Sequence, residues 1–228
     1  MENQKPNSGI SKPANTRQLF WIVIAGILLY VVLDVIAQLL PPHYSPLSQA
    51  ESDLAVGRYG YIMTINFVNR GILSLVFIYA FMKTVNLSGV NSRQYWLGIS
   101  LLGVWGIGAL LLAAFPTDVP ATPISWHGAI HLLVAVLAFL GGAFGELSLS
   151  LRFGPNNKWS ALKRYALPIS VLAVIFCLVD LGLPFLAHHL AASIGGLVER
   201  IFLGFVLLWM AVVSAYLIRQ GSTSDKPT

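Results

Sequence analysis

The sequence predicts an all-α fold: a polytopic membrane protein with a bundle of six transmembrane helices and both termini in the cytoplasm. Three observations predict this fold. Hydrophobic residues make up 56% of the 228-residue chain and charged residues only 10%, whereas a soluble domain carries about 25% charged residues. The apolar residues gather in six runs, each near the length of about 20 residues that a helix needs to cross the hydrocarbon of a bilayer. Lys and Arg are also unevenly divided between the two sets of loops.

The first 18 residues are polar and rich in Pro, Asn, Ser and Lys, which predicts a disordered cytoplasmic tail. A transmembrane domain is predicted over residues 19–218, and residues 219–228 are expected to form a second disordered cytoplasmic tail. The first apolar run ends in two prolines without a small-residue cleavage pattern, so we interpret it as an uncleaved helix and not as a signal peptide. The predicted helices cover residues 19–40, 59–81, 96–115, 126–149, 165–186 and 194–218.

The distribution of positive charge predicts the orientation. With the amino terminus inside, the outer loops carry only Arg58, and the cytoplasmic side carries Lys5, Lys12, Arg17, Lys83, Arg93, Arg152, Lys158, Lys163, Arg164, Arg219 and Lys226. This excess follows the positive-inside rule. Residues 41–58, residues 116–125 and a short link around His188 and His189 are therefore expected outside. Because the basic residues do not form one stripe, the expected partners are membrane lipids and not nucleic acid. No oligomeric state is predicted.

Small residues predict where the helices approach one another closely. In a bilayer, lipid supplies no hydrophobic drive for helix association, and small side chains allow backbones to come near. We expect this role for Ala138, Gly141, Gly142 and Gly145 in the fourth helix and for Gly195 and Gly196 in the sixth.

Several ionisable residues lie inside the predicted spans, where one charge costs about 2.5 to 3.5 kcal/mol on insertion scales. Most of them fall in the outer half of the bundle, which predicts a shared polar cavity open to the outside. The catalytic candidates are Asp34 and Asp180, and the substrate-binding candidates are Arg70, Arg200, Glu199 and Asn66. Alternatively, Arg70 and Arg200 pair with Asp34, Asp180 and Glu199 and only hold helices together. Glu146, near the inner end of its helix, is expected to reach the cytoplasmic interface.

A turn with three prolines precedes the fourth helix and brings a second group of polar residues together. His127 and His131 are four residues apart and therefore share one helix face, and Asp118 lies in the turn before them. His127 and His131 are candidate zinc ligands, and Asp118 or Asp180 would serve as the third ligand or as the base. A zinc-bound water could then attack a lipid ester or amide. Alternatively, the histidines form an interfacial pair hydrogen-bonded to loop carbonyls beside Trp126.

Other chemistry is disfavoured. Haem needs axial ligands on opposite sides of the iron, which two histidines one turn apart cannot supply. A hydrolase using Ser125 beside His127 would lack a nucleophile elbow. The single cysteine, Cys177, excludes an intramolecular disulfide and is expected to be a small buried apolar residue.

Four motifs along the chain resemble a known family. They are Tyr44-Ser-Pro-Leu47, Arg58-Tyr-Gly60, Phe115-Pro-Thr-Asp118 followed by His127-Gly-Ala-Ile-His131, and Gly196-Leu-Val-Glu-Arg200 followed by Trp209. Together they resemble the prokaryotic six-helix membrane proteins of domain-of-unknown-function family 998. The resemblance implies a multi-pass protein of the prokaryotic cytoplasmic membrane and no particular activity. A looser similarity, of chemistry alone, links the aspartate and the HxxxH helix to the alkaline ceramidase and adiponectin-receptor hydrolases.

Three functions are consistent with these residues. The first is metal-assisted hydrolysis of a lipid or lipid-linked substrate, with Arg70 and Arg200 holding an anionic head group. The second is a small proton-coupled transporter, which requires a water path from the outer cavity past Arg70 toward the cytoplasm. The third is a non-catalytic sensor or assembly protein whose intramembrane ion pairs are structural.

Overall fold

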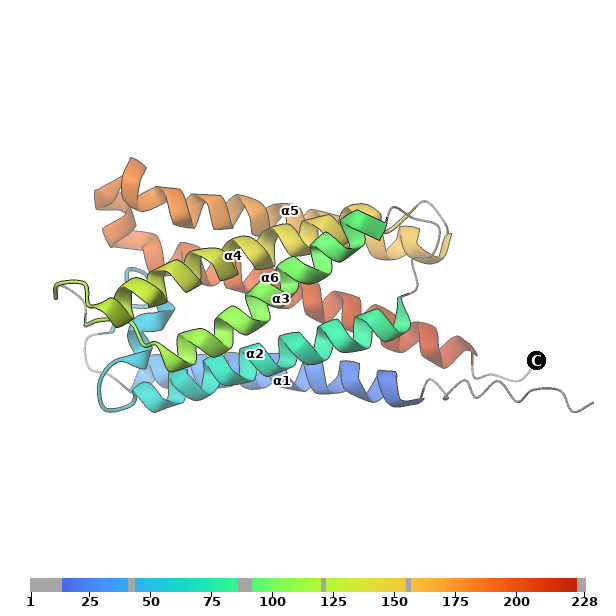
Figure 1. Cartoon of the computed structure of the whole chain (residues 1–228), viewed down its shortest axis with the longest axis horizontal. Coiled ribbons are helices and arrows are strands. Elements are labelled where there is room, and N and C mark those ends of the chain that lie inside the picture. Colours follow the sequence, from blue (N-terminus) through green and yellow to red (C-terminus); the bar gives the residue numbers. More distant parts are fainter. Residues whose placement is uncertain (1–13, 41–43, 86–91, 120–121, 155–156, 225–228) are drawn as a thin grey trace, which may run out of the picture.

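The structure is a computed structural model that describes residues 14–40, 44–85, 92–119, 122–154 and 157–224. Within these residues, six helices are long and apolar enough to cross a membrane, and they run side by side along the long axis of the molecule (Figure 1). No strand occurs among the described residues, which confirms the predicted all-α six-helix fold. The helices are α1 (Ala14–Leu39), α2 (Gly60–Thr84), α3 (Ser92–Ala114), α4 (Trp126–Arg152), α5 (Asn157–Leu186) and α6 (His188–Ser224).

The helices form a closed ring in which chain neighbours are also neighbours in space. Each helix packs against the next one in the chain, and α6 returns to pack against α1. Figure 1 shows α1 and α2 along one side, α5 on the other side and α3 crossing obliquely between them. We call the end at which α2, α4 and α6 begin the cap end. The first residues of α1 and the last residues of α6 lie together at the opposite end.

The connection between α1 and α2 is folded into the cap end of the bundle. Its described part, residues 44–59, contains the 3-10 helix η1 (Glu51–Ala55) and is called the cap segment below. Glu51 and Leu54 are buried, with exposed fractions of 2% and 3%. Gly57 has a φ of 82°, a left-handed conformation that glycine adopts without strain. The sequence predicted an outer loop here, but no buried helix.

The helix bounds differ from the prediction at several places. Only Ala187 separates α5 from α6, so His188 and His189 begin α6 and do not form a loop. Helix α1 begins at Ala14 and α6 continues to Ser224, so both extend into the predicted tails. The remaining tail residues, 1–13 and 225–228, lie outside the described residues, and their disorder stays a prediction.

Glycines bring α3 and α4 into close contact, as predicted. A Cβ atom added at Gly141 would lie 2.6 Å from the carbonyl oxygen of Leu101, and one at Gly145 would lie 3.1 Å from that of Gly98. The contact at Gly141 leaves no room for a larger residue, and the contact at Gly145 is tighter than an ordinary van der Waals contact. In α6 the prediction was wrong for Gly195, whose Cβ would meet nothing within 4 Å, and Gly196 faces the cap segment instead of a helix.

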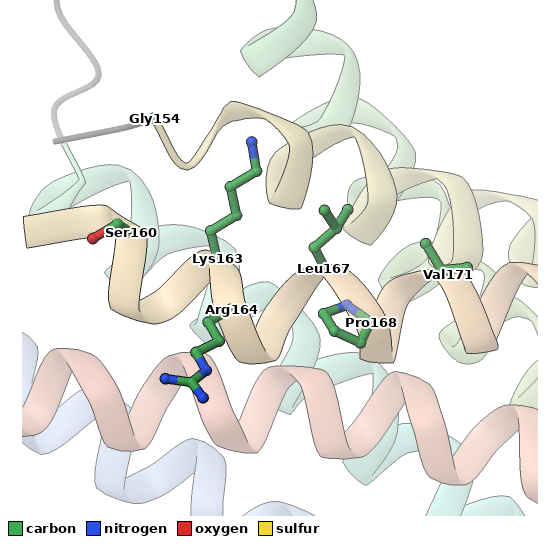
Figure 2. A pocket seen from close by; sticks show the side chains of 7 residues that line it. All are labelled: Gly154, Ser160, Lys163, Arg164, Leu167, Pro168 and Val171. Carbon is green, nitrogen blue, oxygen red and sulfur yellow. The ribbon is translucent and has the colours of Figure 1, made fainter. Parts of the chain in front are cut away.

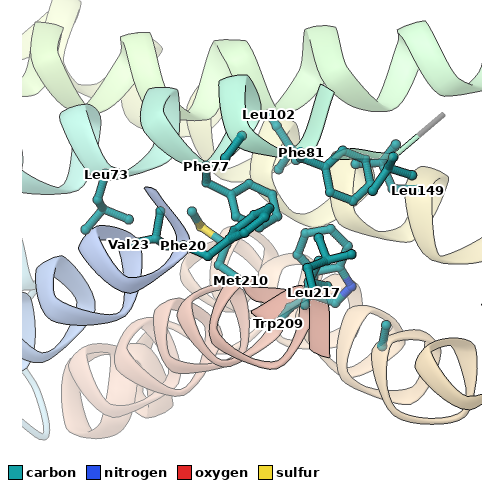
Figure 3. Close-up of a cluster of buried hydrophobic side chains, with 14 of the residues drawn as sticks. Phe20, Val23, Leu73, Phe77, Phe81, Leu102, Leu149, Trp209, Met210 and Leu217 are labelled. Carbon is teal, nitrogen blue, oxygen red and sulfur yellow. The ribbon is translucent and has the colours of Figure 1, made fainter. Parts of the chain in front are cut away.

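Aromatic side chains fill the interior between Arg70 and the opposite end (Figure 3). Phe77 lies two turns beyond Arg70 on α2, and its ring centroid is 5.7 Å from those of Phe81 and Trp209. The indole nitrogen of Trp209 donates a hydrogen bond of 2.7 Å to the Ser150 hydroxyl. Side chains of α1, α2, α4 and α6 therefore close the interior on this side of Arg70.

Glu146 lies inside the bundle and not at an interface. Its exposed fraction is 0%, and neither carboxyl oxygen has a hydrogen-bond partner among the described residues. The expectation that it reaches the cytoplasmic interface was wrong. The physical reason is the rotation of α4 about its axis. A Cβ added at Gly142 would lie 3.0 Å from the Trp105 ring, so Gly142 faces the interior. Glu146 is one turn further along α4 and therefore shares this inward face.

Candidate functional site

Apart from Glu146, the polar residues singled out from the sequence fall into two groups, both at the cap end. One group surrounds Arg70, and the other is the turn that leads into α4. The first group, called the Arg70 cluster below, is connected by hydrogen bonds, an ion pair and charge interactions, and it comprises Tyr30, Asp34, Glu51, Asn66, Arg70, Asp180, Glu199 and Arg200.

Arg200 fastens the cap segment to α6. Its Nη1 donates hydrogen bonds of 3.0 Å to the backbone carbonyl oxygens of Pro46 and Gln49. Its Nη2 donates to the hydroxyl of Tyr44, and that hydroxyl donates a bond of 2.8 Å to the carbonyl oxygen of Ala50. A planar guanidinium presents several donors in a rigid arrangement, which suits it to holding several carbonyl groups at once. The hydrogen bonds of Arg200 thus fix the backbone path of the cap segment.

Glu51 is the centre of the Arg70 cluster and joins three helices. Its Oε1 accepts a hydrogen bond from the Tyr30 hydroxyl on α1. Its Oε2 lies 3.7 Å from Nη1 of Arg70 on α2. Its backbone N–H donates a bond of 3.2 Å to Oε2 of Glu199 on α6. The cap segment is therefore held through buried, charge-assisted contacts, which are stronger than neutral hydrogen bonds.

Arg70 is 1% exposed, and aromatic rings surround its guanidinium. The Cζ atom lies 4.6 Å from the ring centroid of Trp105 and 5.1 Å from that of Phe67, within the range of cation–π attraction. Asn66, one turn earlier on α2, donates a hydrogen bond of 3.1 Å to the carbonyl oxygen of Tyr30. Among the described residues, Nε and Nη2 of Arg70 and Oδ1 of Asn66 have no hydrogen-bond partner.

Carboxylates outnumber guanidinium groups in the Arg70 cluster. Asp34 acts electrostatically on Glu51, and both Glu51 and Asp180 act on Glu199. The cluster therefore contains four acids and two basic residues, Arg70 and Arg200. If all six were ionised, its net charge would be two minus four, or −2. Like charges held close together in a poorly solvated place disfavour the ionised form. The cluster thus has more negative charge to balance than its own arginines supply.

The pKa values of the cap segment reflect its burial. Burial raises the pKa of Glu51 from its usual 4.5 to about 7, against the lowering effect of Arg70 and with a further increase from Asp34. Burial also raises the pKa of Asp53 and that of Tyr44. Glu51 therefore exchanges a proton close to neutral pH, where its unfolded counterpart would be ionised.

The second group builds the start of α4. The Asp118 carboxylate accepts hydrogen bonds of 2.7 Å from the Ser125 N–H and 2.6 Å from the Ser125 hydroxyl. The Ser125 hydroxyl oxygen in turn accepts a bond of 3.2 Å from the N–H of Gly128, which is the usual role of serine at a helix start. The two hydrogen bonds from Ser125 hold the pKa of Asp118 below its usual value. Asp118 is thus engaged in the turn itself.

The predicted zinc site is not supported. Within the described ranges, no group of three or more His, Cys, Asp or Glu residues is arranged to hold a metal ion. Nδ1 of His131 lies 2.7 Å from the carbonyl oxygen of Phe115, and the ring centroid of His127 lies 3.5 Å from that of Trp126. The contact of His131 matches the alternative interpretation, in which a histidine bonds to a loop carbonyl beside the aromatic belt.

Glu51 was missed by the sequence analysis, although it makes the only ion pair within 4.0 Å that joins described residues. It lies in the connection between two predicted spans, so its hydropathy surroundings predict an exposed loop residue. The signal that was available is indirect: Arg70 lies at mid-depth and requires a buried partner, and the preceding connection carries two acids, Glu51 and Asp53. The paired-arginine alternative named Asp34, Asp180 and Glu199 as partners instead.

The chain matches one protein-family model. A family model described as "Protein of unknown function (DUF998)" matches residues 23–216, which is most of the chain and includes every residue of the Arg70 cluster. No curated protein matches the chain, and no solved structure does.

Proposed function

The chain belongs to the DUF998 family of proteins of unknown function, and we propose that this multi-pass membrane protein is a proton-responsive sensor whose cap segment closes over an acid-rich site. The observation that carries the proposal is the charge excess of the Arg70 cluster, where four carboxyl groups face two guanidinium groups. A proton is the smallest cation that balances this excess without needing space. Its uptake changes the charge of Glu51, the residue that ties the cap segment to α1, α2 and α6.

The other functions have less support. Metal-assisted hydrolysis needs a ligand set, and none is formed among the described residues. Proton-coupled transport needs a path past Arg70, where the described interior is filled by Leu73, Phe77 and Trp209. The roles predicted for Asp34 and Asp180 as catalytic groups, and for Arg70 and Arg200 as a head-group site, remain predictions. Both arginines already have partners within the protein.

The proton response is expected to follow from the pKa of Glu51. In the closed cap segment this pKa is about 7, whereas a released, solvated Glu51 would have a pKa of about 4.3. At a pH between these two pKa values, Glu51 is protonated when the cap segment is closed and ionised when the cap segment is released. By linkage, the closed form is favoured at low pH and loses this advantage as the pH rises through about 7. The groups facing Glu51 are Tyr30 and Asp34 on α1, Arg70 on α2, and Glu199 and Arg200 on α6.

Hydrogen exchange of the cap segment tests this proposal through Glu51→Gln, which resembles the protonated acid at every pH. At pH 5 the wild type is expected to exchange only about sixfold faster than the variant over residues 44–59. At pH 8 the wild type is expected to exchange several hundredfold faster than the variant, because the full difference between the two pKa values is then expressed. Comparing the two proteins at the same pH cancels the intrinsic pH dependence of exchange.

The matched control is Asp118→Asn, which removes a carboxylate from the same end of the bundle but outside the Arg70 cluster. It is expected to leave the pH dependence of the cap segment as in the wild type and to change exchange only around residues 115–128. A constant ratio between wild type and Glu51→Gln at pH 5 and pH 8 would contradict the proposal.

We also propose that the cap end faces away from the cytoplasm, so that the site senses the outside. The described residues of the opposite end carry Arg17, Lys83, Arg93, Arg152, Lys163, Arg164 and Arg219, against Arg58 in the cap segment, and positive residues favour the cytoplasmic side.

Thiol labelling on intact cells measures this orientation. The variant Leu47→Cys introduces a thiol at a position that is 54% exposed in the cap segment. A membrane-impermeant maleimide added from outside is expected to label it. The wild type is the blank, because its single cysteine, Cys177, is fully buried. Labelling of Leu47→Cys only after the cells are opened would reverse the proposed orientation.

A further inference from the structure

A groove at the opposite end of the bundle runs along the first turns of α5 (Figure 2). Its volume is about 700 Å³, and none of its lining residues belongs to the Arg70 cluster. Lys163 and Arg164 line one part of it, and Leu167, Pro168 and Val171 line the other part. From this arrangement we infer that the groove binds an anionic phospholipid, with the head group at the basic part of the groove and an acyl chain along the apolar wall.

The polarity of the groove changes along the helix in the order that a phospholipid requires. Ser160, Lys163 and Arg164 come first, and Leu167, Pro168 and Val171 follow one to two turns further into the span. From Lys163 to Val171 the axial distance is about 12 Å at helical rise. The polar part therefore lies at the level of the head groups, and the apolar part at the level of the acyl chains. Figure 2 shows Lys163 and Arg164 pointing to different sides of α5. One cation therefore contacts the phosphate directly, and the other adds positive potential at the level of the head groups.

Charge complementarity selects an anionic lipid. Neither the Lys163 side chain nor the Arg164 side chain has an ion pair or hydrogen bond within the described part of the chain. The only acid among the described residues of this end, Glu146, is fully buried and cannot neutralise them. Basic residues next to a membrane surface attract anionic head groups. Long cationic side chains also reach from a helix to the interface while their stems stay in contact with lipid.

The apolar face that continues from the groove is left uncovered by the protein. Only 17% of the most apolar stretch of α5 is buried inside the bundle, compared with 56% for α6. Beyond Val171, the exposed face of α5 continues with Ile175, Leu178 and Val179. A hydrocarbon chain that enters the groove at Leu167 can therefore extend along α5.

Native mass spectrometry of the full-length protein with equal amounts of phosphatidylglycerol and phosphatidylcholine of identical acyl chains tests the inference. The wild type is expected to retain phosphatidylglycerol in preference to phosphatidylcholine. The double variant Lys163→Gln/Arg164→Gln is expected to lower this preference about tenfold. The matched control, Lys83→Gln/Arg219→Gln, removes two cations from the same end outside the groove and is expected to keep the preference.

Two further measurements separate a lipid site from a general attraction. Val171→Trp fills the apolar part while keeping both cations, and it is expected to lower retention of phosphatidylglycerol. Excess glycerophosphate, which has the head group but no acyl chain, is expected not to displace the lipid. The inference is overturned if the two double variants behave alike, if both lipids are retained equally by the wild type, or if glycerophosphate displaces the bound lipid.

Discussion

Replacing Arg70 by methionine is expected to lower the free energy of unfolding by about 3 to 5 kcal/mol at pH 8, because it leaves the buried Glu51 carboxylate without its counter-charge. Both partners are almost fully buried, at 1% and 2% exposed, and Nη1 and Oε2 are 3.7 Å apart. The variant also removes the cation over the Trp105 ring. Equilibrium unfolding in mixed detergent micelles, followed by tryptophan fluorescence, measures the loss.

A double-mutant cycle separates the ion pair from packing. Arg70→Met/Glu51→Gln is expected to be more stable than Arg70→Met alone, because a neutral amide leaves no unpaired charge. The loss in Arg70→Met is also expected to shrink at pH 5, where Glu51 takes up a proton. If the effects of the two single substitutions simply add at pH 8, the ion pair contributes nothing measurable and Arg70 acts through packing alone.

Replacing Gly196 by alanine is expected to displace the cap segment from the bundle. A Cβ at this position would lie 2.1 Å from the carbonyl oxygen of Gln49 and 2.8 Å from that of Pro46. Both are backbone atoms, which cannot rotate away as a flexible side chain can. Overpacking of this kind costs about 1 to 3 kcal/mol. Labelling of a cysteine introduced at Leu54, which is 3% exposed in the cap segment, is therefore expected to accelerate about tenfold.

Gly195 supplies a matched control one residue away. An alanine Cβ there would meet nothing within 4 Å, and alanine favours a helix over glycine by about 1 kcal/mol. In the background that carries the introduced cysteine, Gly195→Ala is therefore expected to label as slowly as its parent and to be equally or more stable. Equal labelling rates and equal stabilities of Gly195→Ala and Gly196→Ala would show that the close contact at Gly196 does not hold the cap segment in place.

The spans were predictable because helix formation in a membrane depends on a local property. A run of about 20 apolar residues must satisfy its backbone hydrogen bonds internally, whatever its neighbours are. The same logic predicted that Asp34, Arg70 and Glu199 would be unusual, since a charge in a span is costly wherever it is buried. The hydrogen bond from Gln38 to Asp34, four residues apart on α1, also follows from helical spacing.

The predicted zinc site failed because spacing constrains only one element. His127 and His131 share a helix, but a third ligand has to come from another segment, and the hydrogen bonds of Asp118 go to Ser125. A histidine pair at this spacing is equally compatible with contacts to a loop carbonyl, which is what His131 makes. Nothing in the local pattern distinguishes these outcomes.

The sequence by itself determined the six helices, the residues that carry charge inside them, and the positive excess at one end. Only the tertiary structure decided which charges meet. Glu51 lies 21 residues from Tyr30 and 148 residues from Glu199, and it reaches both because the cap segment folds back into the bundle. Hydropathy is a property of each segment alone, whereas the rotation of a helix and the path of a connection depend on packing against distant residues. The inward position of Glu146 and the partner of Arg70 belong to this second kind of property.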